Sequence, residues 1–416
     1  MAYSTGERIA HVFRRLGMGS YPELVASTSS ASDAIARALD ISGQAPDVIE
    51  MDVPLDRESA TDIAQLAAPV QSWLSSMILS PRTIEERLTW FWHNHFATAI
   101  QKVRMPYLLW RQHLTIRQHA TGSFRDLLHA IAVDPAMLFY LDGGRNHSGQ
   151  INENFAREVM ELHTMGPGHY TQTDITEAAK ALTGWVVNVP YARTASGFLS
   201  EYEPWEAVYV AFRHRPGSTT ILGSTGEHDP SDVIDLLLEQ PATANFVAAK
   251  MWRDLVGTEA PPSTIQALAG IFRDNYSVMA LAQAIAVHPD FLSDEAVRAK
   301  VRTPVERLVS IARGFGDGEV NERLGFTLHE MAYLPFNPPS PAGYPSGRVL
   351  LGPHQLIHSF DLLAAASPGG WETTADVLFR AGLVDVSDQT RNLIDIAVEP
   401  ATKAAMAVNS PEFALT

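Results

Sequence analysis

The chain has 416 residues, of which 46% are hydrophobic and 19% charged, and this composition is typical of a folded globular protein rather than a disordered one. The formal net charge of −16 at pH 7 argues against nucleic acid or an anionic membrane as a partner, because both are bound through basic patches. Cysteine is absent, which excludes disulfides, thiolate metal sites and cysteine nucleophiles.

The sequence also gives expectations about location. No apolar stretch reaches the length of a membrane-spanning helix. The first residues, Met1 to Arg8, contain no apolar signal region. As written, the chain is expected to be soluble and cytoplasmic.

Most of the chain is predicted to be helical, because apolar residues recur with a period near 3.6. Ser123 is a predicted helix cap, and the Asp134–Pro135 step is expected to end one helix and open the next. The main predicted helices span residues 6–16, 31–40, 58–78, 82–94, 104–120, 123–133, 152–164, 174–184, 230–239, 242–256, 262–273, 277–287, 302–313, 354–366, 372–382 and 388–397.

Two stretches depart from the helical pattern. Residues 186–223 contain β-branched and aromatic runs separated by turn residues, and predict a small β insertion of two or three strands. Residues 335–353 are rich in Pro, Gly and Ser and should be irregular. We therefore predict a mainly α protein, with one large helical domain over residues 1–416 that carries this β insertion.

The most polar predicted helix is the carboxylate segment, residues 152–162, which has three carboxylates, an arginine and two amides in eleven residues. The segment has two readings. It is either a solvated face with a Glu153–Arg157 pair at i, i+4, or a buried row of carboxylates held for chemistry. Charge density alone favours the solvated face. At about 100° per residue the polar side chains fall within roughly 140° of arc: Glu153, Asn154, Arg157, Glu158 and Glu161.

A second polar feature is the histidine segment, residues 92–96, in which His93 and His95 stand among aromatic residues. Two imidazoles so close together suggest a metal site. On a continuous helix, however, residues i and i+2 lie about 200° apart and cannot share one ion. The two rings converge only if the helix ends near His93. The alternative is a pair of core histidines satisfied by backbone groups, and His163 is expected to be a third core histidine.

With these segments in hand, the chain resembles the bacterial domain-of-unknown-function family 1800 over nearly its whole length. The chain departs from the family pattern at His214-Arg215-Pro216-Gly217, where His-Asp-Pro-Gly is common. It also departs at His163, often an aromatic residue, and at Tyr344, often Trp. Members of the family often look exported and often look like neighbours of sulfatase-like proteins. The matching segments are His11–Gly19, Trp92–Phe96, Phe124–Leu128, Asp134–Leu138, Tyr140–Asp142, Asn152–Glu158, Glu161–Leu162, Tyr170–Asp174, Ala181–Trp185 and Pro338–Pro345.

The resemblance implies that the two polar segments form one site, because the family pattern keeps His-Asn-His together with Asn-Glu-Asn and Arg-Glu. The first hypothesis is a metal-assisted hydrolase or oxidoreductase acting on a small-molecule substrate. A Zn, Mn or Fe ion in this pocket would acidify a bound water molecule or activate oxygen. Glu153 would be the general base and Arg157 would hold an anionic group, with Asn154 beside them. The expected metal ligands are His93, His95, Glu158 and Glu161.

Two other hypotheses stay open. Buried Glu–Arg–Asn–His networks can fix the packing of a large helical fold, in which case the protein is a scaffold or accessory binder for a protein partner. A third possibility is a haem protein with His93 or His95 as axial ligand. The enzyme hypothesis depends on whether the histidine segment and the carboxylate segment meet in one enclosed pocket.

Overall fold

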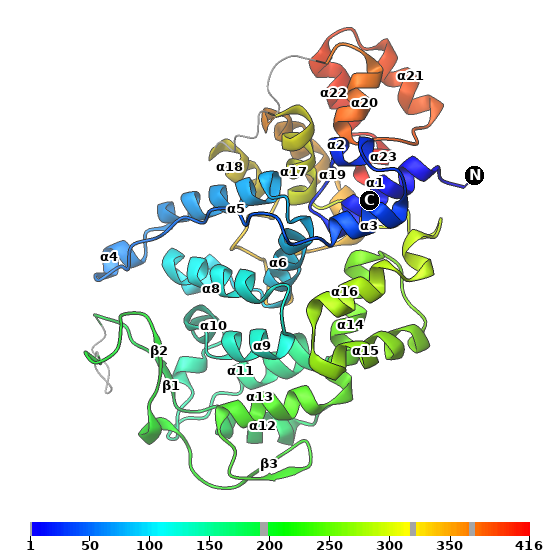
Figure 1. The fold of residues 1–416 in the computed structure, drawn as a ribbon. Helices are drawn as coiled ribbons and strands as arrows, with labels where there is room; N and C mark the ends of the chain where they lie inside the picture. Colours follow the sequence, from blue (N-terminus) through cyan, green and yellow to red (C-terminus); the bar gives the residue numbers. More distant parts are fainter. Residues whose placement is uncertain (1, 192–198, 317–321, 366–370) are drawn as a thin grey trace.

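The computed structural model describes residues 2–191, 199–316, 322–365 and 371–416, and within these ranges the chain is mainly α, as the sequence predicts (Figure 1). The elements of the first part are α1 (Thr5–Leu16), α2 (Pro22–Ala26), α3 (Ala31–Ala38), α4 (Arg57–Ala60), the 3₁₀ turn η1 (Ile63–Leu66), α5 (Ala67–Leu79), α6 (Thr83–His95), α7 (Ile100–Val103), α8 (Pro106–His119), α9 (Phe124–Ala132), α10 (Pro135–Tyr140), η2 (Gly143–Arg145), α11 (Asn154–Glu158), the π-helical segment η3 (Val159–Thr164) and α12 (Gln172–Ala181).

The second part begins with four short strands and returns to helix. Its elements are β1 (Trp185–Val187), β2 (Ala207–Tyr209), η4 (Ala211–Arg213), β3 (Thr219–Ile221), β4 (Ser224–Gly226), α13 (Pro230–Glu239), α14 (Pro241–Leu255), α15 (Pro262–Asn275), α16 (Val278–Ala286), η5 (Pro289–Leu292), α17 (Pro304–Phe315), α18 (Glu322–Glu330), η6 (Gly347–Leu351), α19 (Pro353–Asp361), η7 (Leu362–Ala365), α20 (Thr374–Ala381), α21 (Asp388–Ile396), α22 (Pro400–Val408) and α23 (Pro411–Ala414).

Helix starts follow local chemistry. The Ser123 side chain accepts a hydrogen bond from the backbone N–H of Asp126, so the predicted cap is confirmed. The predicted helix start at Asp134–Pro135 is also confirmed, and there the Asp134 side chain accepts from the N–H of Met137. Each bond satisfies a backbone donor that the first helical turn leaves free. Pro135 then occupies the first position of α10, where its missing N–H costs nothing.

Several predicted boundaries were wrong. The predicted helix 58–78 is divided into α4, η1 and α5, because the Asp62 side chain accepts from the N–H of Ala64 and starts a new turn. The predicted helix 354–366 is divided into α19 and η7, and residue 366 lies outside the described ranges. Four helices were missed because they are short or rich in alanine, which weakens the apolar period: α2, α7, α22 and α23. The helix α18 was also missed, and it contains a glycine, Gly325.

The β insertion is confirmed, with one more strand than predicted. β1 pairs antiparallel with β2, and β3 pairs antiparallel with β4. The missed strand β4 follows a two-residue turn at Leu222 and Gly223, both with positive φ, which is the geometry of a tight hairpin. The labelled strands lie at the opposite end of the molecule from α20–α22 (Figure 1), and residues 192–198 of the insertion are outside the described part.

The helix that organises the interior is α6, which runs through the middle of the molecule (Figure 1) and is buried along almost its whole length. A helix buried on every side must satisfy its charged residues internally. Buried hydrophobic residues from Ile9 to Phe413 form a cluster around it, and the single-domain organisation stays a prediction. The segment 335–353 is irregular apart from η6. Across the described ranges, no helix is both long and apolar enough to cross a bilayer.

Candidate functional site

The two histidines of α6 lie on different sides of that helix, because α6 continues unbroken through His95. The His93 ring packs against Trp73, with 4.7 Å between ring centroids, and against Phe336 at 5.3 Å. The His95 ring instead packs against Phe96 at 4.6 Å. The helix end near His93, which the two rings would need in order to converge, is therefore absent.

Both imidazoles are buried and neutral. Each residue is 2% exposed. Burial lowers the pKa of His93 to about 3 and lowers the pKa of His95 well below its ordinary value. The Nε2–H of His95 donates to the backbone carbonyl oxygen of His163 at 3.0 Å, which is the backbone satisfaction expected of a core histidine. His163 is itself 2% exposed, so its predicted core position is confirmed.

A further histidine joins His93 in the aromatic interior, and sequence reasoning missed it. The ring of His113, on α8, also packs against Trp73, with 4.3 Å between the ring centroids. The Nδ1 atoms of His93 and His113 are both buried without a hydrogen-bond partner in the described structure. No local pattern around His113 indicates this proximity, because α6 and α8 are brought together only by packing.

The predicted helix 152–164 is two different helical segments. α11 ends at Glu158 and continues as a π-helix, in which the N–H of Met165 donates to the carbonyl of Met160 five residues earlier, at 3.0 Å. The Thr164 hydroxyl donates to the carbonyl of Val159 at 2.6 Å and helps to hold the wider turn. π-Helical turns are rare and are frequent at functional sites. The wider turn changes the direction of the side chains that follow Glu158.

The first part of the carboxylate segment is an open surface. Arg157 donates to Glu153 at 3.2 Å, and their side chains are 39% and 34% exposed. Glu153 also accepts from Thr176 at 2.7 Å and from Gln172 at 2.8 Å, and chiefly the Thr176 bond lowers its pKa. These two residues match the solvated reading. They are not enclosed with the histidines.

Asn154 has a local structural contact. Its side-chain amide donates to the carbonyl of Leu141 at 3.0 Å, and its backbone N–H donates to the side-chain oxygen of Asn152 at 2.9 Å. Both bonds fix the start of α11. The described contacts give Asn154 no link to either histidine of α6.

Glu158 and Glu161 differ from the exposed pair. Glu161 accepts a hydrogen bond from the Tyr170 hydroxyl at 2.9 Å. Glu158 is half-buried and, among the described residues, has no hydrogen bond or ion pair. Burial first, and the charge of Glu161 second, raise its pKa. The pKa of Tyr140 rises to about 12 through burial and the charge of Glu158, so the two side chains lie near each other.

The predicted metal ligands do not form one ligand set. Within the part of the chain that the structure describes, no group of three or more His, Asp or Glu side chains is placed to hold an ion. The rings of His93 and His95 diverge, and the Nε2 of His95 is already occupied by a carbonyl. The residues present therefore do not fit a Zn, Mn or Fe site built from His93, His95, Glu158 and Glu161. Aromatic rings pack against both histidines, and neither fits a haem axial ligand.

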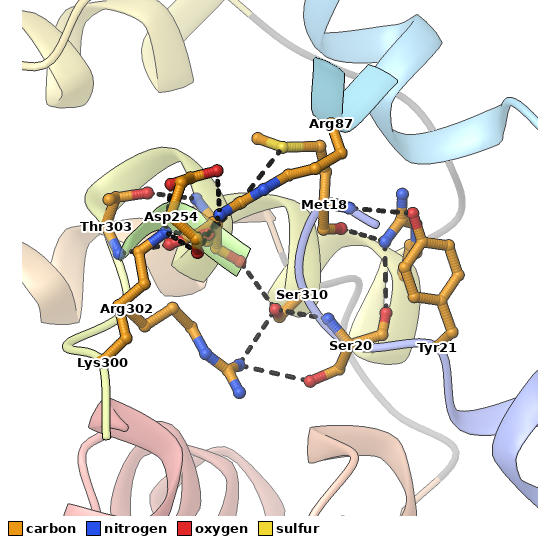
Figure 2. A network of polar contacts seen from close by, with 11 residues as sticks. Met18, Ser20, Tyr21, Arg87, Asp254, Lys300, Arg302, Thr303 and Ser310 are labelled. Atoms are coloured by element: carbon orange, nitrogen blue, oxygen red, sulfur yellow. Dashed lines mark hydrogen bonds and ion pairs between the residues drawn. The ribbon is translucent and has the colours of Figure 1, made fainter. Parts of the chain in front are cut away.

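A buried ion network, which the sequence did not suggest, surrounds Arg87 of α6 (Figure 2). Arg87 of α6 forms an ion pair with Asp254 at 2.8 Å and another with Glu306 of α17. Lys300 donates to the second oxygen of Asp254 at 2.7 Å. Burial alone would raise the pKa of Glu306, but the charges of Lys300 and Arg87 hold it well below its usual range. Each buried charge thus has an opposite partner.

The same network explains the first matching segment of the chain. Ser310 of α17 accepts from the N–H of Ser20 at 2.8 Å and from Arg302 at 3.0 Å (Figure 2). Gly19 has φ +77°, and a Cβ there would stand 2.5 Å from the Ser310 hydroxyl oxygen. The guanidinium of Arg313 lies 3.6 Å from the Tyr21 ring centroid. The end of this segment and the two residues after it therefore pack against α17 through hydrogen bonds and a cation–π contact.

A small cavity lies beside α11. Its volume is about 240 Å³, and it is lined mainly by apolar side chains. Phe155, three residues before Glu158, contributes one wall, and Trp185 contributes another. The indole Nε1 of Trp185 is buried and has no hydrogen-bond partner among the described residues. Trp90 and Trp92, by contrast, are packed in the core.

The fold and these polar groups define a mainly α protein that encloses a buried ion network and carries a half-buried carboxyl pair. The family model described as "Protein of unknown function (DUF1800)" matches residues 11–415, and the chain therefore belongs to that family. Neither the comparison with curated proteins nor the comparison with solved structures found a match.

Proposed function

We propose that this protein is a hydrolase that uses Glu158 as general acid and Glu161 as general base, without a metal ion held by the predicted ligand set. The observation that supports it is the different surroundings of two carboxyl groups three residues apart. A carboxyl group whose pKa is raised, as that of Glu158 is, beside a second carboxyl is a usual arrangement of a general acid and its partner.

The roles follow from the contacts. The pKa of Glu158 is raised, because burial and the neighbouring Glu161 charge disfavour its ionised form. The Tyr170 hydroxyl donates to Glu161 at 2.9 Å and holds that carboxyl in place. Glu158 then donates a proton to a leaving oxygen, while Glu161 accepts one from water.

The substrate class follows from charge. The net charge of −16 disfavours anionic substrates, and the two acting groups are themselves acidic. A protonated carboxyl group beside an ionised one is the pair of catalytic groups that cleaves acetals, as in glycoside hydrolysis. Tyr170, which is half-buried, donates to Glu161 and offers aromatic surface to a sugar ring. We therefore propose an uncharged glycoside as substrate.

The test is turnover of a panel of 4-nitrophenyl glycosides by purified protein. Under this proposal, Glu158→Gln and Glu161→Gln each lower the rate at least a hundredfold, on the usual scale for general acid–base groups. Glu153→Gln, a carboxylate in the same segment that faces solvent, is the matched control and keeps the rate. Absence of turnover across the panel, or full activity in Glu158→Gln, contradicts the proposal.

A second candidate is a non-catalytic scaffold for a protein partner, and the ion network around Arg87 favours it. Four charged side chains of that network are largely withdrawn from water and face one another, which fixes packing without any reacting group. Under this alternative, Glu158→Gln leaves every binding property unchanged. Co-purification of a defined partner, lost in network variants that still fold, would support it.

A further inference from the structure

Lysine is scarce in this protein, and one lysine differs from the rest. The chain has five lysines, all in the described ranges. Four of them donate to an oxygen atom: Lys102 to Asp142 (2.9 Å), Lys180 to Glu177 (2.5 Å), Lys300 to Asp254 (2.7 Å) and Lys403 to the carbonyl of Glu372 (3.2 Å). Among the described residues, Lys250 has no hydrogen-bond or ion-pair partner.

The surroundings of Lys250 disfavour its positive charge. The side chain is half-buried on α14, and its Nζ lies 5.4 Å from the ring centroid of Phe246, one turn earlier. Arg253, on the same helix, lowers the pKa of Lys250, and Lys250 in turn lowers the pKa values of His95 from α6 and His163 from η3. None of these is a carboxylate. Burial first, and Arg253 second, lower the pKa of Lys250 from 10.5 to about 8.

A second unsatisfied nitrogen belongs to His95, whose ring also lies near Phe246. The His95 ring is 6.4 Å from the Phe246 ring. Because the Nε2 of His95 donates to a carbonyl oxygen, its hydrogen is on Nε2 and the Nδ1 atom keeps a lone pair. That Nδ1 is buried without a donor in the described structure. A buried polar atom with no partner calls for an explanation such as a bound ligand.

We infer that Lys250 is a carbonyl-reactive amine whose ligand is a small aldehyde or ketone with a flat apolar group that packs on Phe246. The amine nitrogen attacks the carbonyl carbon, and a proton moves from nitrogen to the former carbonyl oxygen to give a carbinolamine. Loss of water then forms a C=N bond, so both amine hydrogens leave in the water molecule. No electrons are exchanged with another reactant. A desolvated lysine near an aromatic ring and another cation is a known way to prepare such a nucleophile.

The probe is benzaldehyde with sodium cyanoborohydride, applied to the whole folded protein at pH 7.5. Reduction converts any imine to a stable secondary amine, and peptide mapping by mass spectrometry then reads all five lysines separately. We expect Lys250 to be modified about tenfold faster than each of the other four, because a far larger fraction of it is neutral at this pH. Between pH 8 and pH 6 its rate should fall steeply. In 8 M urea the selectivity should disappear.

Two variants test the stated causes. Arg253→Gln removes the neighbouring positive charge at an exposed position and should lower the rate at Lys250 roughly twofold. Lys250→Arg keeps the charge and should remove the fast adduct while leaving the four slow ones. The inference is overturned if Lys250 reacts no faster than Lys102 or Lys403. It is also overturned if the preference survives in urea, since it would then come from local sequence. Neither outcome bears on Glu158 or Glu161.

Discussion

The ring of His95 and the backbone of His163 are joined by a hydrogen bond of 3.0 Å, in which the Nε2–H donates to the carbonyl oxygen. This bond links α6 to the π-helical end of the carboxylate segment. The two segments that the sequence singled out therefore do meet, but they meet through a packed, neutral contact. The acidic side chains Glu158 and Glu161 have their own neighbours, Tyr140 and Tyr170.

The buried histidines should make stability depend on pH. Burial lowers the pKa of His163 to about 3 from the ordinary 6.5, so the unfolded chain binds the proton more readily than the folded one. The stabilisation is therefore fully present above about pH 6.5 and is lost as pH falls toward the folded value. His163→Phe should flatten the decline of the unfolding free energy below pH 6 by about 1.4 kcal/mol per pH unit. Urea denaturation between pH 7.5 and 5.0 measures this.

The control for that experiment is His169→Gln, because His169 is exposed. Its pH profile should follow that of the unmodified chain. Parallel profiles for His163→Phe and the unmodified chain would show that His163 does not stay neutral on folding.

The carboxyl pair predicts a coupled titration. Part of the raised pKa of Glu158 comes from the negative charge of Glu161. Glu161→Gln removes that charge and should lower the pKa of Glu158, as read from the ¹³C chemical shift of its carboxyl carbon. Glu153→Gln, farther along the segment on the exposed face, should leave the Glu158 titration where it is. An unchanged titration curve of Glu158 in Glu161→Gln would show that the two carboxyl groups are not coupled, and would contradict their proposed acid and base roles.

The ion network should be sensitive to loss of one partner. Glu306→Gln removes one of the two carboxylates that Arg87 and Lys300 share, the other being Asp254, and should lower the unfolding free energy by about 3–5 kcal/mol. Glu58→Gln, at an exposed position of α4, should change it by less than about 0.5 kcal/mol. Adding Arg87→Met to Glu306→Gln should recover part of the loss. No recovery would mean that volume, rather than charge, dominates the effect.

The same network has a pH signature of its own. The folded-state pKa of Glu306 is depressed, so its contribution is present above the unfolded value near pH 4.3 and is lost as pH falls below it. This loss begins at lower pH than the loss from the histidines. Thermal unfolding of Glu306→Gln and the unmodified chain should therefore converge as the pH is lowered toward 3.

Asp134 should make stability fall as the pH rises, which is the opposite of the effect of His163 and Glu306. The carboxylate accepts from Gln112 at 2.8 Å and from the N–H of Met137 at 3.0 Å, yet burial raises its pKa to about 7. A raised folded pKa means that stability is fully present below the unfolded value near 3.9 and is lost as pH rises through 7. Asp134→Asn keeps both acceptor bonds and removes the charge. Its stability relative to the unmodified chain should rise between about pH 4 and pH 7 and level off above pH 7, as measured by urea denaturation. Parallel curves of stability against pH for Asp134→Asn and the unmodified chain would show that burial does not disfavour the charge of Asp134.

Much of the fold could be predicted because it is written in local patterns. The helix starts at Ser123 and Asp134 depend on a side chain three residues from the N–H it satisfies, and both were found. The strands near Val186, Val208 and Thr220 show their β-branched composition directly. The π-helical turn after Glu158 could not be found, since an α-helix and a π-helix share nearly the same apolar spacing over six residues.

The candidate site was predicted only in part. Glu158 and Glu161 do share a polar environment, but the tyrosines beside them come from α10 and from the loop before α12. The Arg87–Glu306 pair joins residues 219 positions apart, and no periodicity reveals such a contact. In the structure Glu85, Glu86 and Arg87 are all buried.

By itself the sequence determined the helical class, the β insertion, most helix positions and the family, because these depend on composition, short-range spacing and segment order. Only the tertiary structure decided which polar residues are enclosed and which face water. That choice depends on how helices pack across long separations, and on whether each buried charge finds an opposite one there. His93 and His95 illustrate the division: their spacing is visible in the chain, but the uninterrupted turn of α6 sends their rings into different parts of the interior.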